Sequence, residues 1–158
     1  MEAGGNSQQQ EVINVVGARP RGRFSAVDRV RKASEFRVIQ RTGRRVTTTH
    51  FVLILYARDE QAESTPPRLG IVASRKVGNA VHRNRAKRLV REAFRATRQQ
   101  LDTGVDLVVI VRRPLAELKL ADVIGEWHGQ ASAVRRQLAK AQRDRVARAA
   151  GAEKGPKC

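Results

Sequence analysis

Cysteine is almost absent from this chain of 158 residues, because Cys158 is the only one. One cysteine can form neither a disulfide within the chain nor a cysteine-based zinc site. Long apolar runs are absent too: none approaches the ~20 residues of a membrane-spanning helix, and residues 1–10 lack the apolar centre of a signal peptide. We therefore expect a cytoplasmic protein without a membrane contact.

Acidic residues are scarce relative to basic ones. The chain has 15 Asp and Glu against 32 Lys and Arg, which gives a formal net charge of +17 and a pI near 11.6. Such an excess favours a polyanionic partner, and arginine, which outnumbers lysine, suits bidentate phosphate contacts. The composition predicts a nucleic-acid-binding protein and does not separate RNA from DNA.

The residues that a protein nuclease needs are also missing or scattered. A two-metal nuclease requires clustered carboxylates, whereas Asp102 and Asp106 flank a turn into a predicted strand and the other acids are dispersed. His50, His82 and His128 lack the spacing of metal ligands. There is no Walker-type glycine-rich loop. We predict that the chain holds no catalytic residue and no metal site of its own.

Hydrophobic periodicity predicts one domain over residues 23–142, a disordered extension over 1–22 and a basic flexible tail over 143–158. Ser34 is the expected N-cap of the first helix, and Gly43 is expected to end it in the left-handed conformation. The expected elements are a helix over 34–42, a strand over 47–57, a strand over 68–74, a helix over 81–101, a strand over 105–111 and a helix over 120–150.

The first predicted strand is apolar on both faces. Alternation of side chains places Phe51 and Leu55 on one face and Val52, Ile54 and Tyr56 on the other. A strand with one face in water would carry polar residues on that face. We therefore expect protein or a ligand to cover both faces.

The helix predicted over 81–101 is basic along one side and apolar along the other. Arg83, Lys87 and Arg91 lie four residues apart, and the helix contains a single acid, Glu92. Like charges at this spacing repel one another, so the row indicates an anionic ligand. Phosphates of a folded RNA would neutralise the row, with strongly salt-dependent binding.

One stretch of the chain resembles a known family. Residues 69–94, with the sequence LGIVASRKVGNAVHRNRAKRLVREAF, closely resemble the signature of the bacterial ribonuclease P protein family. The centre of that signature is Arg83-Asn84-Arg85, followed by Lys87-Arg88 and Arg91. The similarity spans about residues 29–136 and includes Phe36 with Gly43, the strand 51–55 and the stretch 106–114, DLVVIVRRP.

The resemblance implies an α/β sandwich in the order αβββαβα, with a small central sheet of the ribosomal protein S5 domain 2-like kind. The basic helix would lie in a left-handed β-α-β crossover, against the usual right-handed rule. In function, the resemblance implies a monomeric protein cofactor that binds ribonuclease P RNA and precursor tRNA. The RNA subunit would carry the active site and use Mg²⁺, and the reaction would be endonucleolytic removal of the 5′ leader from precursor tRNA.

The resemblance also assigns two RNA-binding surfaces. The basic helix and the loop before it would bind the catalytic RNA through Arg75, Lys76, Asn79, Arg83, Asn84, Arg85, Lys87, Arg88, Arg91 and Arg95. A cleft between the first helix and the sheet would take the single-stranded leader, lined by Phe36, Val52, Ile54 and Ser74. For Phe36 and Ile54, ordinary packing in the core is the competing interpretation.

The chain departs from the family at two positions of this cleft. It has Gln40 and Ile54 where the family often has aromatic residues. Stacking of an unpaired base on an aromatic ring contributes ~1–3 kcal/mol. Leader affinity should therefore depend more on charge in this chain.

Three other functions are compatible with parts of the sequence. A ribosomal or ribosome-assembly protein would share the charge but would bind rRNA without any dependence on a leader. A DNA-binding module would read a duplex with the basic helix, but Asn84 is the only base-reading side chain near its start, so phosphate contacts fit the pattern better. A protein-only nuclease would cleave without an RNA partner.

Overall fold

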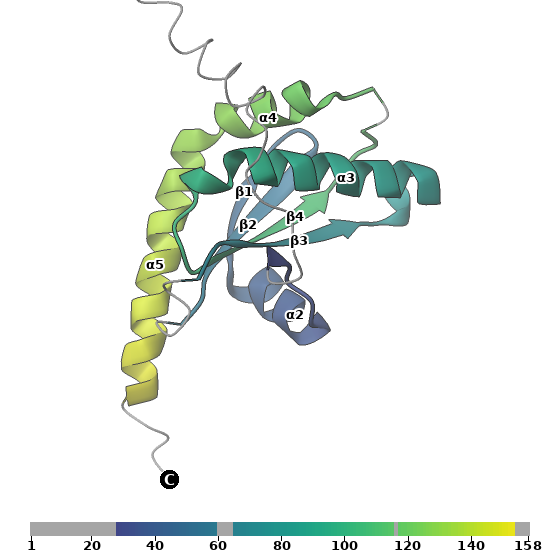
Figure 1. The fold of residues 1–158 in the computed structure, drawn as a ribbon. Coiled ribbons are helices and arrows are strands. Elements are labelled where there is room, and N and C mark those ends of the chain that lie inside the picture. Colours follow the sequence, from purple (N-terminus) through teal and green to yellow (C-terminus); the bar gives the residue numbers. More distant parts are fainter. Residues whose placement is uncertain (1–27, 60–64, 116, 154–158) are drawn as a thin grey trace, which may run out of the picture.

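The computed structural model describes residues 28–59, 65–115 and 117–153 (Figure 1). The elements follow the order αβββαβα, with the last helix divided into two, which confirms the predicted order. Their bounds are α2 Ala33–Thr42, β1 Arg44–Thr47, β2 Phe51–Ala57, β3 Arg68–Ala73, α3 Ala80–Thr97, β4 Val105–Val111, α4 Leu120–Gly129 and α5 Ala131–Glu153. In these ranges, no helix combines the length and the apolar character needed to cross a membrane.

The four strands form one mixed sheet in the order β1-β2-β4-β3. β2 pairs antiparallel with both β1 and β4, whereas β3 and β4 are parallel. Because parallel neighbours cannot be joined by a tight turn, the chain crosses from β3 to β4 through α3. This crossover lays the basic helix along one side of the sheet, while α2 lies on the other side (Figure 1).

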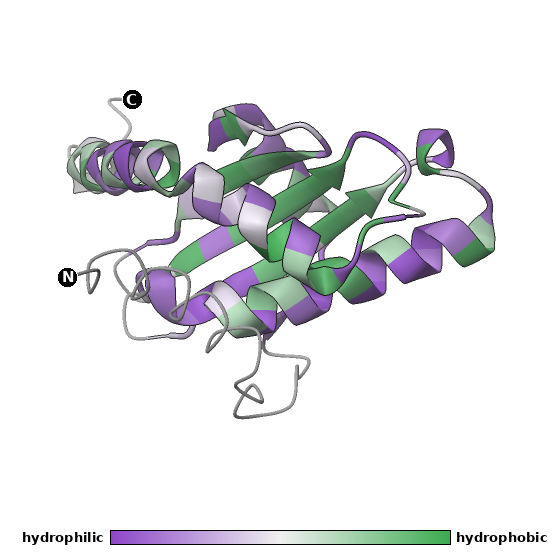
Figure 2. Cartoon of the chain, turned by 90° about the horizontal axis from the view of Figure 1, so that it is seen from above, coloured by the Kyte–Doolittle hydropathy of each residue, from purple (hydrophilic) through white to green (hydrophobic). Residues whose placement is uncertain are grey.

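Each face of the sheet has its own apolar cluster. The face under α3, α4 and α5 has the larger cluster, in which Phe51, Leu55 and Phe94 are fully buried. The smaller cluster, on the face under α2, is formed by Val30, Ile39, Ile54 and Val108. Figure 2 shows the strands as mostly hydrophobic and the helices as mixtures of hydrophilic and hydrophobic positions. The expectation that both faces of the central strand are covered is confirmed, although the second cover is partial.

The segment 47–57, predicted as a single strand, contains a hairpin turn between two strands. β1 ends at Thr47 and β2 begins at Phe51. Thr48 closes the turn, because its amide donates to the Phe51 carbonyl at 2.8 Å and its hydroxyl accepts from the Phe51 amide at 3.1 Å. The run of threonines has high β propensity, which hid the turn, although a threonine hydroxyl can also stabilise one.

The first helix begins and ends differently from the prediction. It begins at Ala33 with Lys32 as its N-cap, so Ser34 lies inside the first turn. Gly43 is extended, with φ −69° and ψ 161°, and not left-handed, because β1 begins at the next residue. Glycine is needed for a different reason: a Cβ at position 43 would lie 2.5 Å from Cγ2 of Ile54.

The last predicted helix is interrupted, and it extends past the predicted end of the domain. Gln130, with φ −105° and ψ 13°, separates α4 from α5. Asp144 of α5 is paired with Arg44 of β1 at 2.8 Å, and the helix continues to Glu153. The folded domain therefore extends beyond the boundary expected at residue 142, because an ion pair holds a segment that has little apolar periodicity. The extension over 1–22 and the last residues of the tail lie outside the described residues.

Candidate nucleic-acid interface

A fixed turn leads into the basic helix α3. β3 ends at Ala73, and in the 3-10 turn that follows, Val77 is buried. Gly78 has φ +134°, a conformation that favours glycine. Asn79 is the N-cap, and its side-chain oxygen accepts a hydrogen bond from the His82 amide at 3.0 Å. The start of α3 is therefore held in one position relative to the sheet.

An apolar stripe determines which side of α3 faces outward. The buried residues of the stripe are Ala86, Leu89, Val90, Ala93 and Phe94. The predicted RNA-binding residues share the remaining surface of α3 and its preceding turn, so the structure brings them together. Arg75, Lys76, Asn79, Asn84, Arg85 and Arg88 are exposed, and Arg83, Lys87, Arg91 and Arg95 are half-buried.

Besides the N-cap Asn79, Arg85 also makes a structural contact. The Arg85 guanidinium donates from Nη1 to the Leu115 carbonyl at 2.5 Å and from Nη2 to the Leu118 carbonyl at 2.7 Å. These bonds fasten the connection between β4 and α4 to the basic helix. Arg85 therefore supports the fold at this place, which the sequence pattern alone did not reveal.

The sheet face under α2 is only partly covered. α2 lies over Ile54 and Val108, which are fully buried. The next cross-strand row consists of Val52, Ile110 and Val72, which pair in register across β2, β4 and β3. All three side chains are half-buried, and we call them the open row. They occupy the position where the sequence predicts the leader cleft.

Phe36 and Ser74 border the open row. Phe36 is half-buried on α2 and packs on the same apolar cluster. Gly70 of β3 makes room for its ring, since a Cβ at position 70 would lie 2.7 Å from Cε1 of Phe36. Ser74 is exposed directly after β3, where the chain turns toward α3. Three of the four predicted cleft residues thus lie around one surface.

Ile54, the fourth, lies in a different place. Its side chain is fully buried in the cluster under α2, so the packing interpretation is correct for this residue. Gln40, one turn after Phe36, is half-buried, and its backbone carbonyl accepts a hydrogen bond from Arg45 Nη2 at 2.7 Å. An arginine of β1 therefore lies near the position where the family often has an aromatic ring.

A buried charge cluster lies at another part of the α2 face. Asp106 of β4 is 1% exposed and accepts hydrogen bonds from Nε and Nη2 of Arg68 at 2.9 and 2.8 Å. Arg68 Nη2 also donates to Oε2 of Glu35 at 2.6 Å, and Arg58 Nε lies 3.1 Å from Oδ1 of Asp106. A cavity of about 240 Å³ opens beside this cluster, next to Tyr56.

In the charge cluster, the carboxylates of Asp106 and Glu35 are paired with arginine side chains. The hydrogen bonds that Arg68 donates to Asp106 raise the pKa of the Arg68 guanidinium, although burial opposes this shift. Sequence reasoning missed the cluster; the available signal was an acid at the start of an otherwise apolar strand. Within the described ranges, no three His, Cys, Asp or Glu residues are grouped so that they could hold a metal ion.

Comparison with known proteins agrees with the geometry. The sequence model of the Ribonuclease P family matches residues 24–135. The ribonuclease P protein component of Syntrophus aciditrophicus is 37% identical over 99 residues, which are 63% of this chain and 80% of that protein. The corresponding protein of Bacillus cereus is 37% identical over 95 residues, which are 60% of this chain and 80% of that protein.

Solved structures share the fold. The RNase P protein of Staphylococcus aureus gives a TM-score of 0.58 at 27% identity, covering 70% of this chain and 97% of that chain. The RNase P protein of Thermotoga maritima gives a TM-score of 0.56 at 31% identity, covering 65% of this chain and 94% of that chain. Sequence and fold therefore place the chain in the ribonuclease P protein family.

Proposed function

We propose that this chain is the protein cofactor of a ribonuclease P ribozyme. It binds the catalytic RNA through α3 and the 5′ leader of precursor tRNA along the open row, and it promotes endonucleolytic removal of the leader in tRNA maturation. The catalytic centre and its Mg²⁺ belong to the RNA subunit, and the protein acts as a monomer within a cytoplasmic ribonucleoprotein. The observation that carries the proposal is that the basic side of α3 begins where the open row ends, at Ser74.

The basic side of α3 suits a phosphate backbone. The buried stripe prevents the helix from rotating, so Arg83, Lys87 and Arg91 stay on consecutive turns in a fixed order. Each phosphate that they neutralise releases counterions, so affinity should fall steeply with salt. The positive side chains of α3 also reduce the repulsion between the catalytic RNA and the substrate RNA.

The open row suits a single strand. Unpaired bases can lie on apolar and aromatic side chains with little sequence preference. Val52, Val72 and Ile110 offer such a surface, and the ring of Phe36 borders it. A leader of variable sequence needs this kind of contact.

The experiment is a reconstitution. A 5′-extended precursor tRNA is incubated at low Mg²⁺ with a bacterial ribonuclease P RNA, with this chain, and with both. We expect strong cleavage at the mature 5′ end only with both. Cleavage by the protein alone would identify a nuclease, and the absence of stimulation would favour the ribosome-assembly alternative.

Arg88 and Arg85 offer a matched pair for the α3 surface. Both are exposed, but only Arg85 donates to the carbonyls of Leu115 and Leu118. We expect Arg88→Ala to reduce affinity for ribonuclease P RNA and to lower the salt slope by about 1, without a change in melting temperature. Arg85→Ala should also destabilise the fold, by about 1–2 kcal/mol. Unchanged RNA affinity and salt slope for Arg88→Ala would contradict the proposed role of α3.

A further inference from the structure

The open row ends at both edges of the sheet. At the β3 edge it meets Ser74 and the basic turn before α3. At the other edge the row continues onto β1, because Val52 is paired with Thr47, which is exposed. A strand of RNA that follows the row away from α3 therefore reaches Thr47, and by passing around the β1 edge it comes to the side of the sheet on which α5 packs.

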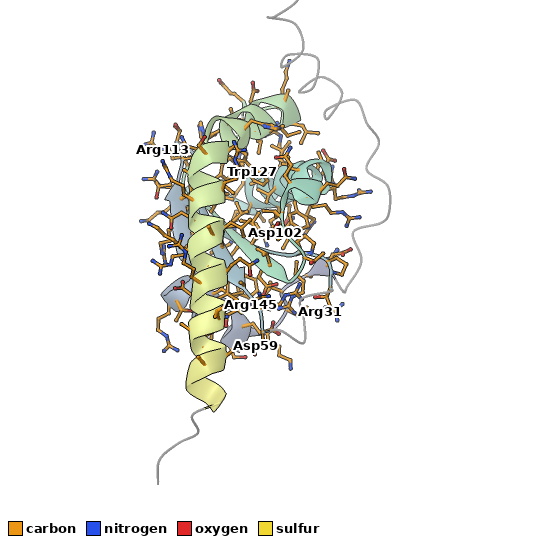
Figure 3. The ribbon with its side chains drawn as sticks, turned by 90° about the vertical axis from the view of Figure 1, so that its left-hand side faces the viewer. Arg31, Asp59, Asp102, Arg113, Trp127 and Arg145 are labelled. Atoms are coloured by element: carbon orange, nitrogen blue, oxygen red, sulfur yellow. The ribbon has the colours of Figure 1, made fainter. Side chains whose placement is uncertain are left out.

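Helix α5 is fixed beside this second edge. Arg44 of β1 donates from Nε and Nη2 to the two carboxylate oxygens of Asp144, both at 2.8 Å. Four residues later, the Arg148 guanidinium stands over the Tyr56 ring at 4.5 Å and donates to the Ala57 carbonyl. These contacts fix the rotation of α5 as well as its position. Figure 3 looks onto the outer side of the helix.

The rotation places a basic stripe on the exposed flank of α5, away from the buried residues Leu138 and Ala141. Lys140 and Arg136 precede Asp144 by four and eight residues, so they lie on the same side of α5 as the residue that faces β1. Eight helical residues span ~12 Å, and the three steps from Arg44 to Thr47 along β1 span ~10 Å. Arg136 and Lys140 are therefore level with the part of β1 where the open row ends.

The one acid that α5 contains between Ala131 and Asp144 is Asp144 itself, and it is already paired with Arg44 of β1. Arg136, Lys140 and Arg143 are exposed. Like charges at such spacing destabilise an isolated helix, and an anion along them would remove that repulsion.

We infer that Arg136, Lys140 and Arg143 form a second phosphate-binding row, which holds the part of the 5′ leader that has passed around the β1 edge. The inference rests on the proposed function, because it concerns the same leader. The open row contacts the leader next to the cleavage site, and α5 contacts nucleotides further upstream. Long leaders should therefore bind more tightly than short ones, through added phosphate contacts.

The test compares two precursor tRNAs bound to the reconstituted holoenzyme, one with a leader of about 4 nucleotides and one with a leader of about 12. We expect the long leader to bind roughly tenfold more tightly, with a salt slope steeper by about 2, since three single-strand phosphate contacts contribute about 0.7 each. The triple variant R136Q/K140Q/R143Q should lose this advantage and bind the short leader as the wild type does.

Arg135→Gln and Arg136→Gln form the matched control. Both residues are exposed neighbours on α5, but only Arg136 lies on the stripe that continues through Lys140 to Asp144. Arg136→Gln should reduce the salt slope for the long leader, and Arg135→Gln should leave it unchanged. Equal effects of the two substitutions would mean that net charge and not position matters, and would overturn the inference.

Other results separate this inference from the proposed function. If the wild-type protein stimulates cleavage but long and short leaders bind equally, the α5 row is wrong and the cofactor role stands. The row is also wrong if the triple variant loses affinity for ribonuclease P RNA alone, because α5 then serves the RNA subunit. If the protein gives no stimulation with either leader, the proposed function itself fails.

Discussion

The two faces of the sheet are covered to different extents, although the strands are apolar on both. On the face under α3, α4 and α5, Phe51, Leu55 and Val109 are fully buried, with 0% of their surface exposed. On the face under α2, Val52 and Ile110 remain half-buried, although their neighbours Ile54 and Val108 are fully buried. Three helices close the first face, and one short helix covers part of the second.

The difference in cover gives the two faces different roles: the closed face stabilises the fold, and the α2 face can bind a partner. Apolar burial contributes about 25 cal/mol per Å² removed from water, so the closed face, which has the larger buried cluster, stabilises the fold more than the α2 face does. An open apolar row gains that free energy only when a partner covers it, which makes it a binding surface. Each face also has a charged fastening: the Asp106 cluster lies on the α2 face, and a His50–Glu126 pair joins the hairpin turn to α4 on the closed face.

Two phenylalanines test this separation most strongly. Phe94 is 0% exposed in the closed cluster, and Phe36 is half-buried beside the open row. We expect Phe94→Ala to lower the free energy of unfolding by about 3–5 kcal/mol, the usual cost of removing a buried ring. Phe36→Ala should cost less than half as much and should weaken leader binding. Chemical denaturation and precursor binding measure the two effects.

The comparison would fail if Phe36→Ala destabilised the protein as much as Phe94→Ala and left leader affinity unchanged. Phe36 would then be a core residue like Ile54, and the α2 face would be a second structural core. Phe36→Leu provides a control, because it keeps apolar volume and removes the aromatic ring. A loss of affinity in Phe36→Leu without a loss of stability would show that the ring itself contacts RNA.

Removal of Asp106 should have the next largest effect. Asp106→Asn keeps the shape but takes the charge partner away from Arg68 and Arg58, whose guanidinium groups lie partly buried. We expect a loss of about 2–3 kcal/mol, less than for a fully buried pair, because solvent reaches both arginines. Urea denaturation at neutral pH gives the value. A loss of less than 0.5 kcal/mol, about the limit for a surface pair, would mean that Glu35 alone satisfies Arg68.

The alternation of the central strand predicted the two faces but not their covers. Phe51, Leu55 and Ile54 were assigned to the correct faces because the side-chain period of a strand is fixed. The fraction of each face that helices cover depends on where α2 and α5 pack, which is tertiary information. For that reason Ile54 was predicted in the cleft and is found in the core.

The basic surface of α3 was also predictable from side-chain periodicity. The arginine contacts that were not predicted depend on tertiary structure. The apolar stripe of α3 determines which residues face outward, so the position of Arg83 and Arg88 follows from spacing alone. The contact of Arg85 with the Leu115 carbonyl joins segments 30 residues apart, and the Arg44–Asp144 pair joins segments 100 residues apart. No local pattern indicates such contacts.

The pair on the closed face should give the smallest effect, and it depends on pH. The His50 amide donates to Glu126 Oε1 at 2.7 Å, and His50 Nδ1 lies 2.9 Å from Oε2. Burial acts to raise the pKa of Glu126, but the hydrogen bonds from His50 and Thr48 together outweigh it, so the pKa lies below its usual value of 4.5. A carboxylate whose pKa is lowered by folding stabilises the protein above its unfolded pKa and loses this contribution as the pH falls through the folded value.

We therefore expect Glu126→Gln to cost about 1 kcal/mol near pH 7, and the difference from the wild type to shrink as the pH falls below 4.5. Thermal unfolding of both proteins between neutral and acidic pH measures this convergence. Because the pair lies on the closed face, leader affinity at neutral pH should stay unchanged in the variant. A drop in leader affinity without a change in stability would show that the hairpin turn, and with it the closed face, takes part in binding, and the division between the two faces would no longer hold.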